Sequence, residues 1–239
     1  GAQIRQQAVA RAFVERFRAL ELERARDLDW RGWIDRYVEL TRWDVELAAA
    51  GERSLYDSLR ALYPDMRREF ATYLKTAYPA WLRGARGDRP ALSVDVVPEF
   101  LLPLLGAGRA AAFVVVDCLR LDQWMVLEPI LAQWFDVETT HYYAVLPTAT
   151  PYSRNALFSG LYPAELAARH PQWWGEREDE TLNAHERELL DLQLRAARGP
   201  TPVKYHKISS AADSDDLERH LSGALLGDGI SAFVFNFID

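Results

Sequence analysis

Asp117 stands where its residue type could support metal chemistry. It directly follows Ala111–Val116, a short apolar run rich in β-branched residues that predicts a buried parallel strand. Ligands of open α/β sheets bind outside the carboxyl ends of the strands, so a carboxylate at this point is well placed to hold a cation. An Asp that only caps the following turn or helix is the alternative, and the residue types leave both interpretations open.

Thr150 occupies a second position of chemical interest. It lies in LPTATPYSRNALFSG, residues 146–160, and directly precedes Pro151. Because Pro favours the first position of a helix, Thr150 is predicted to be the N-cap, where backbone N–H groups and the helix dipole favour an anion. This place suits a phosphate, and it suits a hydroxyl that must ionise to attack phosphorus beside a divalent metal. An ordinary Thr-Pro helix start is the alternative.

Arg154 and Asp239 extend the predicted site. Arg154 follows Thr150 by one helical turn, so its guanidinium could hold two phosphate oxygens, unless it is simply a solvated helix arginine. Asp239 ends SAFVFNFID and repeats the arrangement of Asp117 on a second apolar run. The two carboxylates and the hydroxyl could therefore converge at one edge of a sheet. The five histidines show no spacing typical of metal ligands and are interpreted as surface or core residues: His141, His170, His185, His206 and His220.

The elements that must position these residues follow from apolar periodicity. The first third of the chain shows four amphipathic helical stretches with short connections, which predicts an antiparallel bundle. Asp29 can cap the second helix, Gly51 can end it, and Pro64 is predicted to separate the third helix from the fourth. Residues 83–93, RGARGDRPALS, are rich in Gly, Pro and Arg and form the predicted linker.

Beyond the linker, short apolar strands alternate with helices, which is typical of an α/β domain with a mainly parallel sheet. The predicted strands cover residues 111–116, 142–146, 203–208 and 231–238. The fold class is therefore α/β, with a helical bundle domain at 1–92 and an α/β domain at 93–239.

Composition limits the function classes. The chain has 239 residues, a formal net charge of −7 and a pI near 5.3, which argues against a broad basic surface for nucleic acid. Its one cysteine, Cys118, excludes an intrachain disulfide, fits a reducing compartment and is expected to point into the core. The N-terminus shows no signal peptide and no stretch is long and apolar enough for a membrane span. We therefore predict a soluble, cytoplasmic protein.

Several motifs resemble those of known families. Three sets from the second part of the chain resemble the PglZ domain of the alkaline-phosphatase superfamily: VVVDCLRLDQW at 114–124, LPTATPYSRNALFSGLYP at 146–163, and Gln172–Trp174 with Asn183 and Glu186. The helical stretches 29–47 and 73–82 resemble the linker bundle of PorX-type response regulators. Those proteins join a receiver domain, a helical bundle and a PglZ domain, and they regulate type IX secretion in bacteria.

The resemblance implies a role for each matching residue. It implies that Asp117 binds a metal and that Thr150 is the nucleophile and also contacts the metal. Ser153 and Arg154 look like the Ser-Arg that follows the nucleophile in the related sulfatases, which implies that Arg154 contacts the substrate. Asn155 is predicted to contact the substrate beside it. Asp239 would be the first residue of an Asp-x-x-x-His metal motif. The family normally holds two zinc-type ions and transfers phosphoryl groups through a covalent intermediate, and PorX-like proteins hydrolyse phosphodiesters of short or cyclic oligonucleotides.

The ends of the chain modify this expectation. Residues 1–239 include no receiver domain, and the later histidine ligands are expected to follow Asp239, which directly ends a predicted strand. Catalytic zinc typically has about three protein ligands, so we expect this piece alone to bind metal weakly and to be nearly inactive.

Two other functions stay open. One is a regulatory interaction module whose tryptophan-rich bundle faces, around Trp30, Trp33 and Trp43, bind partners; the same tryptophans could instead be bundle core. The other is a phosphomonoesterase, sulfatase or phosphomutase of the same superfamily. Expected partners are an oligonucleotide or other phosphodiester substrate, components of type IX secretion or sigma-factor regulation, and a second copy of the chain.

Overall fold

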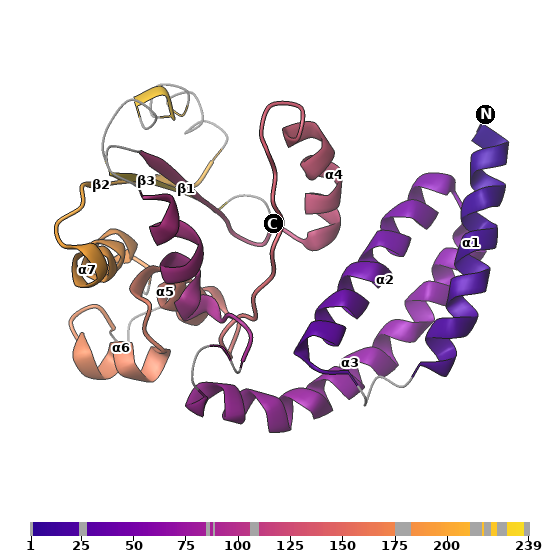
Figure 1. The fold of residues 1–239 in the computed structure, drawn as a ribbon, viewed down its shortest axis with the longest axis horizontal. Helices are drawn as coiled ribbons and strands as arrows, with labels where there is room; N and C mark the ends of the chain where they lie inside the picture. The colour runs from indigo at the N-terminus through magenta and orange to yellow at the C-terminus, as the bar shows by residue number, and fades with distance from the viewer. Residues whose placement is uncertain are drawn as a thin grey trace. The chain divides into compact units, whose positions relative to one another are not determined.

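The fold is described from a computed structural model of the chain. It describes residues 2–23, 28–84, 87, 89–105, 110–174, 183–210, 217, 221–223 and 229–236. The chain divides into two compact units, and each is described by itself below (Figure 1). The first unit contains Gly1–Pro90 and Arg120–His141, and the second contains Ala91–Leu119 and Tyr142–Asp239.

The first unit is helical. Its helices are α1 (Ala2–Leu22), α2 (Trp30–Ala50), α3 (Arg53–Arg83) and α4 (Leu121–Leu131). Helix α2 begins and ends as predicted: the Asp29 carboxylate accepts from the Gly32 N–H at 2.8 Å, and Gly51 ends the helix at φ 73°. The left-handed conformation at the C-terminal end of α2 suits glycine, which has no Cβ to clash with the backbone.

The predicted break at Pro64 is wrong, because α3 continues through Pro64 and Pro79. A proline inside a helix removes one backbone hydrogen bond but does not prevent the helix when neighbouring turns are held by packing. Here the buried core of the bundle includes Leu59 just before Pro64, and Met66 packs against it just after. Burial on both sides of the proline therefore stabilises one long helix instead of two short ones.

Two tryptophans of this unit, Trp33 and Trp81, are buried, whereas Trp30 and Trp43 are only partly buried. Trp33 is 3% exposed and its ring lies 5.1 Å from that of Phe70, while Trp43 contacts Phe13 with ring centroids 5.4 Å apart. The bundle core consists of apolar side chains from the first three helices: Phe13, Leu20, Leu40, Leu47 and Leu59. Trp33 is thus a core residue, and Trp43 packs against the core from a partly buried position, as their helical spacing allows.

The second unit contains a three-stranded parallel sheet, which confirms the α/β fold class. The strands are β1 (Ala111–Val116), β2 (Val203–Ile208) and β3 (Ile230–Phe235), in the order β1-β3-β2. Val116 and Ile208 both pair with Phe235, so the three carboxyl ends lie level with one another. Polar residues that directly follow these strands are therefore brought to the same edge of the sheet.

Helices α5 (Thr150–Ser159), α6 (Pro163–Arg169) and α7 (Glu186–Arg198) accompany the sheet. Figure 1 shows α5 and α7 on the same side of it, and the Phe158 ring of α5 lies 5.7 Å from that of Phe113 on β1. Shorter helical turns precede β1: Ser93–Asp95, Val97–Leu101 and Leu102–Leu104. Buried apolar residues of the turns, α5, α7 and β3 form one core, with Phe158, Leu189, Leu190 and Val234 among its members.

Two sequence expectations differ from this arrangement. Residues 142–146 are not a strand: Tyr143 makes only an isolated bridge with Leu92, and its N–H donates to the Ala91 carbonyl at 2.9 Å. Val145 is fully buried, whereas Tyr142 and Leu146 are exposed, so the run is apolar in composition without being a buried strand, and composition alone does not distinguish the two cases. The compact units also differ from the predicted domains in residues 120–141, which pack with the helical unit and lie within the predicted α/β domain.

Candidate functional site

Strand β1 and helix α5 bring Asp117 and Thr150 together. Asp117 continues the pairing of β1 by one residue, because its N–H donates to the Phe235 carbonyl at 2.9 Å. The Thr150 hydroxyl donates to Oδ2 of Asp117, with the two oxygens 3.4 Å apart. The other carboxylate oxygen, Oδ1, accepts from the Cys118 N–H at 3.2 Å. Cys118 adopts a left-handed conformation with φ 60° and is exposed, so the prediction that its side chain points into the core is wrong. Both oxygens of Asp117 are therefore oriented by neighbouring groups.

Thr150 is the first residue of α5 and not its N-cap, which corrects the sequence prediction. The N-cap is Ala149, in an extended conformation with ψ 143°. Its carbonyl accepts from the N–H groups of Tyr152 and Ser153 at 2.9 and 3.0 Å, which are the first hydrogen bonds of the helix. Proline is tolerated at either of the first two helical positions, so Thr-Pro does not locate the cap to a single residue. The Thr150 hydroxyl is therefore available to the carboxylate of Asp117.

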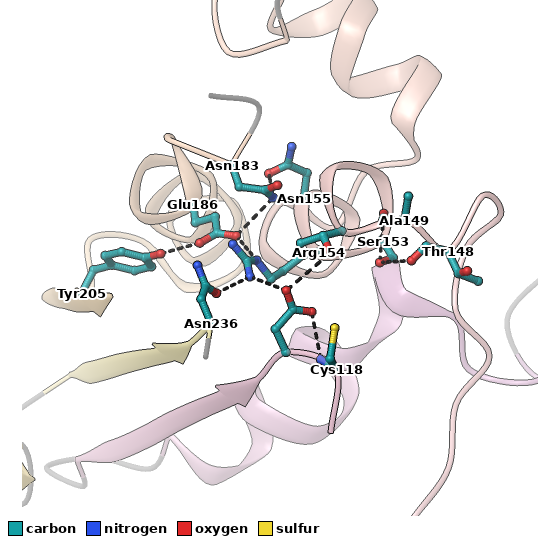
Figure 2. Close-up of polar contacts among 12 residues, drawn as sticks. Cys118, Thr148, Ala149, Ser153, Arg154, Asn155, Asn183, Glu186, Tyr205 and Asn236 are labelled. Atoms are coloured by element: carbon teal, nitrogen blue, oxygen red, sulfur yellow. Dashed lines mark hydrogen bonds and ion pairs between the residues drawn. The ribbon is translucent and has the colours of Figure 1, made fainter. Parts of the chain in front are cut away.

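Arg154 is buried beside this pair. Its side chain is 6% exposed, and that of Asp117 is 29% exposed. Nη1 of Arg154 donates to Asp117 Oδ2 at 3.0 Å and to Asn236 Oδ1 at 2.7 Å, while Nε donates to Glu186 Oε1 (Figure 2). A solvated surface arginine is thus excluded. The guanidinium lies between two carboxylates, so the three charged groups together carry a net charge of −1.

Glu186 lies behind Arg154 and is almost completely buried, with 1% of its side chain exposed. Its Oε2 accepts from the Tyr205 hydroxyl, and its Oε1 accepts from Asn183 Nδ2 at 3.2 Å (Figure 2). Burial raises the pKa of Tyr205 above its ordinary value, and the nearby charge of Glu186 adds to the effect. Tyr205 therefore stays protonated and acts as a hydrogen-bond donor to the carboxylate.

The side chain of Asn155, the other predicted substrate contact, is held inside the domain. Its side chain is fully buried, at 0% exposure, and its Oδ1 accepts from Asn183 Nδ2 at 3.2 Å. Asn183 also donates to Glu186 Oε1, so Asn155 is linked through Asn183 to the carboxylate that accepts from Arg154, and its contact with a substrate stays a prediction. Asp239, the remaining predicted ligand, lies outside the described residues.

Comparison with protein families decides the identity of the part of the chain that holds this site. Residues 97–239 match the family described as the BREX system PglZ alkaline phosphatase-like domain. The chain belongs to the PglZ family. Residues 3–82 match the PorX response regulator linker domain. A comparison with curated proteins finds no match for this chain.

All contacts around Arg154 lie within the PglZ domain. Asp117 and Thr150 are separated by 33 residues, and Arg154 and Asn236 by 82, yet they meet at the carboxyl edge of the parallel sheet. This edge is where open α/β sheets bind ligands. The PglZ domain of this chain thus places a carboxylate, a hydroxyl and a guanidinium together at the expected end of the sheet.

The donors present fit a metal in kind, and they form a partial set. Asp117 and Thr150 supply two oxygens, of the type that divalent ions accept, on neighbouring elements. Among the described residues, no group of three or more His, Cys, Asp or Glu side chains is close enough to hold an ion. None of the described helices combines the length and hydropathy that crossing a membrane would require.

Sequence reasoning missed Asn236 and Tyr205. Asn236 directly follows β3, which is the same kind of position as that of Asp117 after β1. The apolar run FVFNFI hides the end of this strand, because apolar residues continue on both sides of Asn236. Tyr205 lies within β2, where alternation allows a buried polar end but gives no sign of its partner.

Proposed function

We propose that the PglZ domain of this chain is a metal-dependent phosphoesterase that cleaves phosphodiester bonds of short or cyclic oligonucleotides, with Thr150 as the nucleophile. The observation that carries the proposal is the approach of the Thr150 hydroxyl to within 3.4 Å of Asp117 Oδ2 at the carboxyl edge of the sheet. Membership of an alkaline phosphatase-like family supports phosphate-ester chemistry at this edge. A nucleophile held against an acceptor is the arrangement that nucleophilic catalysis requires.

The proposed reaction assigns a task to each side chain. Asp117 accepts the hydrogen bond of the Thr150 hydroxyl and orients the oxygen toward the open edge of the sheet. The Thr150 hydroxyl gives up its proton to solvent as its oxygen forms a bond to phosphorus in line with the leaving oxygen. The bond between phosphorus and the leaving oxygen breaks, and that oxygen takes up a proton from solvent. Water then hydrolyses the phosphothreonine and returns the hydroxyl to its starting state.

A divalent ion such as zinc would be held by Asp117, Thr150 and Asp239, with a second ion in the complete family site. When bound, it would lower the pKa of the Thr150 hydroxyl and balance the charge of the phosphate. This positive charge matters because the chain as a whole carries a formal net charge of −7.

The match to the PorX response regulator linker domain supports a regulatory setting. We propose that the chain acts as the output module of a PorX-like response regulator of type IX secretion, within two-component signalling. Components of type IX secretion, sigma-factor regulators and a second copy of the chain are the partners proposed with it.

The test is zinc-dependent cleavage of a short linear and a cyclic oligonucleotide by the whole protein. Thr150→Ala removes the nucleophile and is expected to lower turnover on the order of 10³-fold or more, as loss of a nucleophile does in other covalent mechanisms. Thr148→Ala is the matched control, because Thr148 is exposed and contributes only its backbone carbonyl to the nearby contacts. Thr150→Ser should keep part of the activity.

Each outcome of this test has a separate meaning. Loss of cleavage in Thr150→Ala but not in Thr148→Ala supports the proposal. Cleavage that survives Thr150→Ala removes this residue from the mechanism. Cleavage of phosphate monoesters or sulfate esters alone would assign a phosphomonoesterase or a sulfatase. A protein that cleaves none of these esters but still binds its regulatory partners would be an interaction module.

A further inference from the structure

We propose that Glu186 is a positioning residue that acts through Arg154 to hold the carboxylate of Asp117 against Thr150. The inference rests on the proposed function for the meaning of this site, and on the contacts of Figure 2 for its geometry. It gives Arg154 a different task from the substrate contact expected of it: the guanidinium orients a site carboxylate and does not hold the phosphate.

Burial of the Arg154–Glu186 pair is the first observation that supports this. The two side chains are 6% and 1% exposed, so neither charge is solvated by bulk water. A buried ion pair of this kind is expensive to form and contributes little net stability compared with apolar residues of the same volume. Its presence beside the site therefore calls for a role other than stability of the core.

The planar shape of the guanidinium is the second observation that supports a positioning role for Glu186. When the Nε–H of Arg154 is held by Glu186 Oε1, the plane of the group and the direction of Nη1 are both set. Nη1 then meets Asp117 Oδ2 at 3.0 Å and Asn236 Oδ1 at 2.7 Å. Glu186 thus determines where the donor to Asp117 lies, although the side chains of Glu186 and Asp117 come from different elements.

Glu186 is itself held from two sides. Tyr205 on β2 donates to Oε2, and Asn183 donates to Oε1 at 3.2 Å. The carboxylate therefore has a fixed orientation, with each oxygen assigned to a partner. A charge held this firmly can orient its partner, whereas a mobile surface carboxylate cannot.

The occupied donors argue against direct phosphate binding by Arg154. A bidentate grip on phosphate needs two parallel N–H groups on one edge of the guanidinium. In this structure Nε and Nη1 already donate to protein oxygens. The positive charge is also shared between Asp117 and Glu186, which leaves it neutralised toward an incoming anion.

The backbone N–H of Cys118 offers a reporter that needs neither metal nor turnover. It donates to Asp117 Oδ1 at 3.2 Å, so its NMR frequency follows the orientation of that carboxylate. We expect Glu186→Gln to move the Cys118 amide signal in a ¹H–¹⁵N spectrum of the whole protein. Glu188→Gln on the same helix is the matched control and should leave the signal in place, because Glu188 is 48% exposed and its ion pair among the described residues is with His185 at 4.0 Å.

A double variant separates positioning from a general packing role. In Arg154→Gln the link to Asp117 is absent, so adding Glu186→Gln should leave the Cys118 signal where Arg154→Gln alone has moved it. A further shift in the double variant would show that Glu186 reaches Asp117 by another route, and would overturn the proposal. If Glu186→Gln does not fold, Tyr205→Phe loosens Glu186 through one hydrogen bond and should move the signal in the same direction by a smaller amount.

Kinetics with the oligonucleotide substrate give an independent arm. Glu186→Gln should lower kcat by about 10- to 100-fold with little change in KM, as is usual for residues that orient a site ligand. A large rise in KM with unchanged kcat would instead assign Arg154 to the substrate. If the wild type cleaves no ester, the proposed function fails, but the Cys118 signal still tests the positioning role. A Cys118 signal that does not move in a folded Glu186→Gln variant overturns the positioning role of Glu186.

Discussion

Thr150 Oγ1 lies 3.4 Å from Oδ2 of Asp117, and the same oxygen accepts from Arg154 Nη1 at 3.0 Å. The two donors come from one face of α5, because residues four apart on a helix are neighbours. The acceptor comes from the end of β1. One helix and one strand therefore determine the geometry around this carboxylate, and the predictions below test its chemistry, its charge balance and the packing that supports it.

The carboxylate of Asp117 should be essential for turnover. Asp117→Asn preserves shape but removes the charge, so the side chain becomes a poor metal ligand and a weaker acceptor for the Thr150 hydroxyl. We expect the loss in kcat/KM with an oligonucleotide to exceed the roughly 10- to 100-fold typical of residues outside the first ligand sphere. Asp122→Asn is the control, since Asp122 pairs with the exposed Arg120 on the surface, where ion pairs contribute little. Equal activity in wild type and Asp117→Asn would exclude this carboxylate from the site.

Removing Arg154 should destabilise the second unit. Arg154→Met leaves the buried Glu186 without its charged partner, and breaking a buried pair in this way typically costs about 3–5 kcal/mol. Protection of the β3 amides from hydrogen exchange, at Phe233 and Val234, reports on this unit alone. We expect that protection to fall in Arg154→Met.

The companion variant replaces both charges. Arg154→Met with Glu186→Met leaves no unpaired charge in the interior, so the double variant should regain much of the lost protection. A double variant that is less protected than Arg154→Met would mean that the cost does not come from the uncompensated charge of Glu186.

Tyr63 on α3 predicts a loss of stability at alkaline pH. Burial raises the pKa of Tyr63 to about 12, and the negative charge of Asp44 adds to this effect. A tyrosine in the unfolded chain ionises near pKa 10, at about two units lower. Above about pH 10 the unfolded state loses this proton while the folded state keeps it, so the contribution is complete below that pH and is lost as the pH rises toward about 12.

Urea unfolding of the wild type and Tyr63→Phe measures this contribution. Between pH 8 and pH 11 the wild type should lose more free energy of unfolding than Tyr63→Phe, which cannot ionise. The difference in tyrosinate absorbance between the wild type and Tyr63→Phe shows the pH at which Tyr63 titrates, because the other tyrosines are common to both proteins. Parallel pH dependences of the two proteins would contradict the burial of the Tyr63 hydroxyl.

Gly160 ends α5 in a conformation that leaves no room for a side chain. Its φ is 66°, and a Cβ would lie 2.4 Å from Nε2 of Gln193 on α7. Gly160→Ala should therefore lower the free energy of unfolding by roughly 1–2 kcal/mol, which is the cost of holding alanine in the left-handed conformation. The clash between the new Cβ and Gln193 should lower it further. Hydrogen exchange of the β3 amides measures this loss of stability. Adding Gln193→Ser should recover only the stability lost through the clash with Gln193. The reference for this comparison is Gln193→Ser alone. If no stability is recovered, the whole cost of Gly160→Ala comes from the backbone conformation.

Local sequence signals accounted for much of the fold. The boundaries of α2 followed from Asp29 and Gly51, because a side-chain cap and a left-handed glycine act within a few residues. The parallel strand before Asp117 followed from its continuous apolar run. The continuation of α3 through Pro64 could not be predicted from local signals, because the packing that overrides a proline comes from other helices. Residues 142–146 likewise have a strand-like composition and no continuous partner strand.

The sequence by itself determined which groups could do chemistry: a carboxylate at a strand end, a hydroxyl beside Pro151 at a helix start, and an arginine one turn later. The tertiary structure alone decided what those groups contact. It placed Thr150 one residue inside the helix, directed Arg154 toward Asp117 and Glu186, and brought in Asn236 and Tyr205. The physical reason is range: capping and periodicity act between neighbours in the chain, whereas a buried charge is located by partners tens of residues away.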